Sequence, residues 1–231
     1  IKPEVADKLD LPADVKVIAG GADNACSAIG NGIVEEGLLL ASIGSSGVIL
    51  AHTDSMQTDQ EGRIHSFNHA KPGKWYLMGV MLAAGLSYRW FRDTFSNIEQ
   101  EIERLTKINT YKLLNKEAAQ VPPGSEGLIF LPYLMGERSP HWNPDARGAF
   151  IGLSLKHDRH DMIRAVMEGV TYNLKIISDI FENNIKFDEI RVIGGGAKGD
   201  IWRKIMADIY NKKVLKPQIL EKATSLGAAI A

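Results

Sequence analysis

The chain has 231 residues, of which 45% are hydrophobic and 24% charged, and its formal net charge is −1. These values are typical of an ordinary globular protein with one large domain or two small ones. They give no electrostatic reason to expect a nucleic acid or a membrane surface as partner. No apolar run approaches the roughly 20 residues of a membrane span. The single cysteine, Cys26, cannot form an internal disulfide, so we expect a reducing compartment, the cytoplasm.

The chain starts at Ile1 rather than Met, with no signal-peptide pattern after it, so we expect a piece of a longer protein. Residues 1–14 are polar and are predicted to be the end of an interdomain linker; the domain itself is predicted over 15–231. The apolar run VKVI at 15–18 predicts a short buried strand, and Gly20 and Gly21 predict a sharp turn after it.

Asp23 and Asn24 follow this turn at the start of a small-residue helix pattern, which Gly30 and Gly32 stop. A carboxylate between a strand and a helix lies where open α/β sheets bind their ligands. The same place is the first turn of a helix, where negative charge is stabilising. From this pattern Asp23 is either a helix N-cap or a catalytic carboxylate.

Two apolar runs in Gly37–Leu50 flank the sequence GSSG at 44–47, which predicts a hairpin with a tight turn. Such a turn presents backbone N–H groups and hydroxyls in a small space, an arrangement suited to a phosphate. For an isolated GSSG sequence a plain turn is the better explanation.

A second hairpin is predicted by strand patterns at 62–70 and 75–80 around a Lys-Pro-Gly-Lys turn. It carries His65 and His69, which on one strand lie ~13 Å apart and cannot share an ion. With neither CxxC nor HExxH in the sequence, we predict no metal site.

Helical spacing over 81–95 includes Gly85, and a glycine inside a helix costs ~1 kcal/mol relative to alanine. Either close packing of another element or a nucleotide would explain it. Residues 97–119 are polar and predict surface helices that end at a Pro-Pro-Gly sequence.

A short buried strand is predicted at 127–133, and an irregular charged and aromatic segment follows at 135–152. Two interpretations remain for this loop: its charged side chains bind a substrate, or they pair with one another in a structural corner. The residues concerned are Glu137, Arg138, His141, Asp145 and Arg147.

Residues 158–183 have the clearest helical pattern, and a buried strand is predicted at 188–196. Gly194, Gly196 and Gly199 then match G-x-G-x-x-G between a strand and a helix, the context of a dinucleotide-binding fingerprint. Too few residues follow for the two further strands of a Rossmann half, which disfavours a dehydrogenase. A glycine-lined turn that admits a flat or phosphorylated ligand remains.

The glycine-rich turns at strand ends and Gly85 form a consistent set. If an α/β domain brings them together, they can hold a nucleotide, with Asp23 as the well-placed carboxylate. We therefore expect these segments to meet around one crevice with Asp23 pointing into it.

The sequence resembles the C-terminal domain of the FGGY carbohydrate kinases over essentially its whole length. The matching motifs are Gly20–Ala25, Ser42–Gly47, Phe130–Tyr133 with Gly136–His141, and Gly194–Lys198. This resemblance implies an α/β, actin-like ATPase (ribonuclease H-like) domain with a mixed sheet flanked by helices. The segment Leu134–Pro144 points to the branch that phosphorylates D-xylulose to D-xylulose 5-phosphate, and the gluconate and ribulose kinases have similar loops.

The resemblance also implies roles for individual residues. Asp23 would be the general base that accepts the proton of the sugar hydroxyl, and Asn24 would contact the sugar. The residues implied to bind ATP are Gly44, Ser45, Ser46, Gly85, Arg89, Gly195, Gly196, Ala197 and Asp200.

In the family, Mg²⁺ bridges the phosphates and its main protein contact is in the N-terminal domain, which is absent here together with much of the sugar site. We therefore expect this chain alone to bind nucleotide weakly and not to phosphorylate a sugar at a useful rate. Its expected partners are a sugar, ATP, its own N-terminal domain and, as a possibility, a second copy in a homodimer. A non-catalytic actin- or Hsp70-like nucleotide-binding module is the alternative from a different class.

Overall fold

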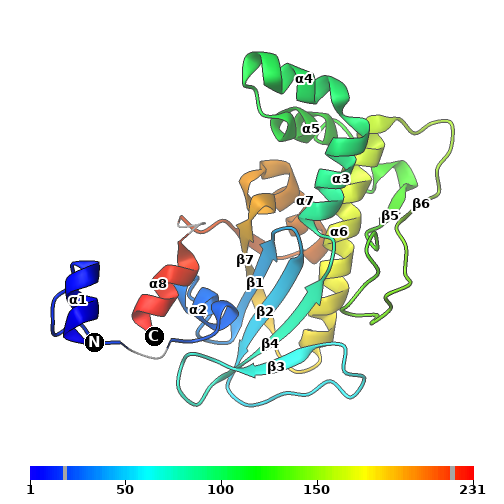
Figure 1. Cartoon of the computed structure of the whole chain (residues 1–231). Helices are drawn as coiled ribbons and strands as arrows, with labels where there is room; N and C mark the ends of the chain where they lie inside the picture. Colours follow the sequence, from blue (N-terminus) through cyan, green and yellow to red (C-terminus); the bar gives the residue numbers. More distant parts are fainter. Residues whose placement is uncertain (18–19, 219–221) are drawn as a thin grey trace.

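A computed structural model describes residues 1–17, 20–218 and 222–231. Its main strands are β1 (Gly37–Ile43), β2 (Gly47–Thr53), β3 (His65–Asn68), β4 (Trp75–Met81), β7 (Phe187–Gly194) and β8 (Lys213–Leu215). They form a six-stranded sheet in the order β3-β4-β2-β1-β7-β8 (Figure 1). The pairs β1–β2, β2–β4 and β3–β4 are antiparallel, whereas β7 is parallel to β1 and to β8. The sheet is therefore mixed, as predicted.

Helices cover both faces of this sheet. The long helix α6 (Arg159–Glu182) packs on one face, and α2 (Asp23–Gly30) with α8 (Ala223–Ile230) packs on the other (Figure 1). Successive residues of a strand point to opposite faces. Accordingly Leu39 joins the core under α6, while Leu40 joins the smaller core under α2.

The remaining helices surround the end of the sheet where β1 and β7 finish. They are α3 (Gly85–Phe95), α4 (Asn97–Thr106), α5 (Thr110–Ala118) and α7 (Asp200–Tyr210). A separate two-stranded sheet is made of β5 (Ile129–Leu131) and β6 (Ala149–Ile151), and α1 (Pro3–Leu9) lies near the N-terminus. None of the helices in the described ranges is long and apolar enough to cross a membrane.

Both hairpins and the long helix are confirmed. The first hairpin turns at 44–46, between β1 and β2, and the second joins β3 to β4. Asp158 caps α6 with a capping box, in which its side chain accepts from the N–H of Asp161 and the Asp161 side chain accepts in return.

The structure adds a helix to the first segment and corrects the strand predicted after it. A helix, α1, occupies part of the expected linker: Pro3 is in its first turn and Asp10 ends it in a left-handed conformation. Residues 15–17 form no strand, and Val17 is 80% exposed, so the prediction of a buried strand is wrong there. Ile18, the last residue of that predicted strand, lies outside the described residues.

In the segment 135–152, the side chains of Glu137 and Arg138 bind partners other than each other. The buried Glu137 carboxylate accepts the backbone N–H groups of Leu82 and Arg138. The Arg138 guanidinium lies against the ring of Trp142 and donates to His65. Both side chains thus have structural partners, but the predicted pairing of the charged side chains with one another is not seen in the described part of the chain, and substrate binding by this loop stays a prediction.

Candidate functional site

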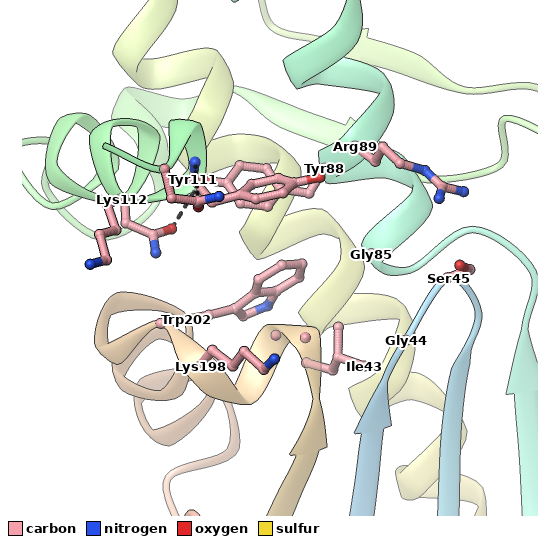
Figure 2. A pocket seen from close by; sticks show the side chains of 15 residues that line it. Ile43, Gly44, Ser45, Gly85, Tyr88, Arg89, Tyr111, Lys112, Lys198 and Trp202 are labelled. Atoms are coloured by element: carbon pink, nitrogen blue, oxygen red, sulfur yellow. Dashed lines mark hydrogen bonds between the residues drawn. The ribbon is translucent and has the colours of Figure 1, made fainter. Parts of the chain in front are cut away.

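A cavity of about 620 Å³ opens beyond the carboxyl ends of the parallel strands β1 and β7. Ligands of open α/β sheets bind at this edge. Figure 2 shows the cavity as a slot with α3 and α5 on one side and the turn after β7 with α7 on the other. Its lining residues are Ile43, Gly44, Ser45, Gly85, Tyr88, Arg89, Asn109, Tyr111, Lys112, Asn115, Gly195, Gly196, Lys198, Gly199 and Trp202.

The β1–β2 turn has its carbonyl groups engaged and part of its N–H groups free. The N–H of Gly85 donates to the Gly44 carbonyl at 2.8 Å, and those of Ala84 and Leu86 donate to the Ser45 carbonyl at 3.0 and 3.1 Å. Among the described residues, the N–H groups of Ser45 and Ser46 have no acceptor. Free N–H groups in a tight turn are suited to binding an anion.

Two glycines that line the cavity have no packing reason to be glycine. A Cβ at Gly44 or Gly195 would meet its nearest neighbour at 3.6 or 3.8 Å, an ordinary contact. By contrast, a Cβ at Gly85 would lie 2.3 Å from the Gly44 carbonyl oxygen, and one at Gly196 would lie 2.6 Å from the Ile43 side chain. The protein's own packing thus explains Gly85 and Gly196, whereas Gly44 and Gly195 leave space for a ligand.

Gly85 differs from its predicted position. It is the first residue of α3 rather than an interior helix residue. The close approach that the sequence implied is made by the backbone of Gly44, so the helix begins where the β1–β2 turn contacts it.

Aromatic side chains form part of the slot. Tyr88 is buried between Tyr111 and Trp202, with ring centroids 5.2 and 5.5 Å away. Its hydroxyl donates to Asn115 Oδ1 at 3.0 Å, and Trp202 Nε1 donates to Thr171. Burial raises the pKa of Tyr88 well above its ordinary value and also raises the pKa of Tyr111, so both phenols stay neutral. Such a wall suits a flat ring.

The charged side chains that line the cavity in the described part of the chain are all basic: Arg89, Lys112 and Lys198. Figure 2 shows Arg89 at the same end as Ser45, and Lys112 at the opposite end. A cleft lined by one sign of charge concentrates ligands of the other sign. The cavity thus combines an aromatic part with a basic, N–H-rich end.

Six of the nine predicted nucleotide-binding residues line this cavity: Gly44, Ser45, Gly85, Arg89, Gly195 and Gly196. Ser46, Ala197 and Asp200 do not, although each is next in the chain to a residue that does. Ala197 is buried and Asp200 is exposed, and both accept hydrogen bonds from the Arg203 guanidinium.

Asp23 and Asn24 also do not line the cavity. The expectation of one shared crevice therefore holds in this chain for Gly85 and for the turns at Gly44 and Gly195, whereas neither Gly20–Gly21 nor Asp23 lines the cavity. Asp23 is the first residue of α2, and the helix N-cap is Ala22. The Asp23 carboxylate is exposed and accepts the N–H of Asn24 at 2.7 Å. Burial raises the pKa of Tyr76 in β4, and the negative charge of Asp23 raises it further. The Asp23 carboxylate therefore lies near β4.

Sequence reasoning missed the contribution of α5. Asn109, Tyr111, Lys112 and Asn115 line the cavity, yet they come from a polar stretch that carries no motif. The one local signal was Asn109, whose side chain caps α5 by accepting the N–H of Tyr111. That signal places a helix and does not indicate a site.

The described residues hold no group of three or more His, Cys, Asp or Glu side chains that would coordinate a metal ion. The described residues that line the cavity include no carboxylate, so the cavity wall itself offers no side chain suited to hold Mg²⁺.

Comparison with known proteins agrees with this geometry. The model of the FGGY family of carbohydrate kinases, C-terminal domain, matches residues 39–231. The xylulose kinase of Bacillus subtilis is 42% identical over 229 residues, which cover 99% of this chain and 44% of that protein. The gluconokinase of the same organism is 38% identical, again over 99% of this chain and 44% of that protein.

The crystal structure of ligand-bound xylulose kinase from Lactobacillus acidophilus has the same fold, with a TM-score of 0.88 at 31% identity over 99% of this chain and 44% of that chain. The predicted fold class is confirmed. The chain spans less than half the length of these relatives. On these grounds, the chain belongs to the FGGY family of carbohydrate kinases and corresponds to its C-terminal domain.

Proposed function

We propose that this chain is the nucleotide-binding half of a sugar kinase that transfers the γ-phosphoryl group of ATP to D-xylulose, giving D-xylulose 5-phosphate. Relatives named xylulose kinase at 42% identity support the pentulose, and the gluconokinase at 38% makes gluconate the second candidate. We keep as predictions from the family resemblance the remaining sugar-binding groups and the contact to Mg²⁺. A homodimer is kept as a possibility, and the cytoplasmic location stays a prediction from the single cysteine.

The observation that carries the proposal is the pair Gly44 and Gly195. Both face a cavity, and the fold itself has room for a side chain at either position. We place the ATP phosphates at the Ser45 end, where free N–H groups and Arg89 lie, and the base in the aromatic slot. Phosphoryl transfer depends mainly on such positioning and charge stabilisation.

Asp23 supplies the remaining chemistry in this proposal. Its carboxylate accepts the proton of the sugar hydroxyl as the oxygen of that hydroxyl bonds to the γ-phosphorus, while the bond to ADP breaks. Because Asp23 is exposed and lies outside the nucleotide cavity, the sugar approaches it from the part of the protein that this chain lacks.

The substrate is tested by assaying the full-length protein with a panel of ketopentoses and aldonates. D-Xylulose is expected to give the highest kcat/KM; a preference for gluconate would replace it by the second candidate. In the same assay this chain alone is expected to give no useful turnover. Full activity of the isolated chain would contradict the proposal that it is only the nucleotide-binding half of the kinase.

Replacing Gly195 by alanine is expected to weaken ATP binding by about 10- to 100-fold, because the new methyl group fills ligand space. The fold is expected to keep its stability, since a Cβ at Gly195 has no close neighbour. Titration of nucleotide together with thermal unfolding checks both points.

Gly196→Ala is the matched control. Its Cβ would lie 2.6 Å from Ile43, so this variant is expected to lose stability as its primary defect. If Gly195→Ala binds ATP as tightly as the parent protein, the nucleotide does not lie against this turn.

A further inference from the structure

Glu137 holds the end of β4. One carboxylate oxygen, Oε1, accepts the N–H groups of Leu82 at 2.9 Å and of Arg138 at 2.7 Å. The other, Oε2, accepts from Asn173 Nδ2 of α6 at 3.1 Å. Beside it, the N–H of Ser139 donates to the carbonyl of Val80 in β4 at 2.9 Å. Residues 137–139 are thus hydrogen-bonded to Val80 in β4 and to Leu82, the residue directly after β4.

The link from β4 to α3 is only three residues long, 82–84. Its last residue, Ala84, and the first two residues of α3, Gly85 and Leu86, donate their N–H groups to the Gly44 and Ser45 carbonyls of the β1–β2 turn. Glu137 therefore binds Leu82, the first residue of this short link, and Ala84, the last residue of the link, binds the β1–β2 turn. A short link transmits a displacement because it has little freedom to absorb one.

We propose that Glu137 is a positioning residue for phosphate binding, acting through Leu82 and the start of α3 on the β1–β2 turn. This inference rests on the proposed function, which makes that turn the phosphate site. Glu137 touches neither the cavity nor the turn. Its effect on the nucleotide is therefore indirect.

A carboxylate suits this position because one side chain must accept from three donors. Burial raises the pKa of the Glu137 carboxyl, while the bonds from Arg138, Leu82 and Asn173 oppose that shift. A buried side chain that keeps all three donors satisfied fixes their relative positions. Truncating it leaves two backbone N–H groups unpaired, and buried unpaired groups force a rearrangement.

The test compares Glu137→Ala with Glu137→Gln in the full-length protein. In the alanine variant, amide hydrogen exchange at Ala84, Gly85 and Leu86 is expected to accelerate by about 5- to 100-fold. The value of kcat/KM for ATP is expected to fall by about 10- to 100-fold because the turn is misplaced, with the KM for the sugar unchanged. Glutamine keeps an acceptor for the two backbone N–H groups but presents an NH2 group to Asn173 Nδ2, so it is expected to restore most of both properties rather than all.

Asp161→Ala is the matched control. Asp161 is also a buried carboxylate that accepts a backbone N–H, that of Asp158 at 2.8 Å, and no hydrogen bond joins it to the link or the turn. It is expected to lower stability without a selective effect at residues 84–86 or on the KM for ATP.

Equal exchange at 84–86 in Glu137→Ala and Asp161→Ala would overturn the proposal, and so would a glutamine variant as defective as the alanine one. Should the alanine variant not fold, Glu137→Asp retains the charge on a side chain one methylene shorter, and unchanged exchange in it would overturn the proposal as well. The exchange measurement needs no activity. Absence of sugar phosphorylation in the parent protein would therefore defeat the proposed function and leave the role of Glu137 to be decided by exchange.

Discussion

Replacing Asp23 by asparagine in the full-length protein is expected to lower kcat by about 10²- to 10⁴-fold while ATP still binds. The reason is chemical: the amide has nearly the same shape, but it cannot accept the proton of the attacking hydroxyl. The KM for ATP is expected to change little because Asp23 does not line the nucleotide cavity. Steady-state kinetics and a nucleotide titration separate the two effects.

This substitution is expected to leave the structure of α2 unchanged. Asp23 is exposed at the first position of α2, and within the described part of the chain its one hydrogen bond comes from the adjacent N–H of Asn24. Asparagine can accept the same bond and is well tolerated at helix starts. A loss of turnover would therefore not be explained by unfolding of α2.

Glu4→Gln provides the control, since Glu4 is another exposed acid in the first turn of a helix, α1. It is expected to leave kcat unchanged. An Asp23→Asn variant that retains more than about a tenth of the parent kcat would contradict general-base catalysis by this residue.

The parts of the site that could be predicted from the sequence depend on local chemistry. The turns at Gly44 and Gly194 follow strands, and a turn is specified by glycines and by the apolar runs on either side of it. Neighbouring parallel strands then end at the same edge of the sheet. This local information was enough to bring Gly44 and Gly195 to one cavity.

The parts that could not be predicted depend on contacts between distant residues. Asn115 reaches the site because Tyr88, which lies 27 positions earlier, binds its side chain. Glu137 acts on a residue 55 positions away. No periodicity or spacing within a single element reports such pairs, so residues of α5 resemble ordinary surface residues in the sequence.

The strand predicted at 15–18 is absent at 15–17 for a related reason. Valine and isoleucine favour strands, but a strand also needs a neighbour with free backbone groups. Both sides of β1 are already taken, by β2 and β7. Among the described residues of that run, Val17 pairs with no strand and remains exposed.

The largest expected loss of stability follows from replacing Glu168 by alanine. Glu168 and Arg164 form an ion pair on α6 at 2.7 Å, with both side chains 5% exposed. Removing one partner leaves a buried charge without its counterion, which costs about 3–5 kcal/mol. Urea unfolding of the folded chain, followed by circular dichroism, measures the change.

This ion pair also fastens the connection between α5 and β5. The Glu168 carboxylate accepts from Gly124 N–H and Ser125 Oγ, and Arg164 donates to the Val121 carbonyl. Ser125 has a φ of 47°, in the left-handed region that is unfavourable for a residue with a side chain. These bonds offset that strain. Because α5 supplies part of the cavity wall, we expect Glu168→Ala to weaken nucleotide binding in the fraction that remains folded.

Asp179→Ala is the matched control on the same helix. Its ion pair with Lys175 has the same spacing of four residues, but the Asp179 side chain is 48% exposed. Solvent screens such a pair, so the expected change is below about 1 kcal/mol. Both pairs lie on the same helix at the same spacing, but Glu168 is buried and also accepts from Gly124 and Ser125, whereas Asp179 is half-exposed. Equal effects of the two substitutions would show that the buried pair does not hold the α5–β5 connection in place.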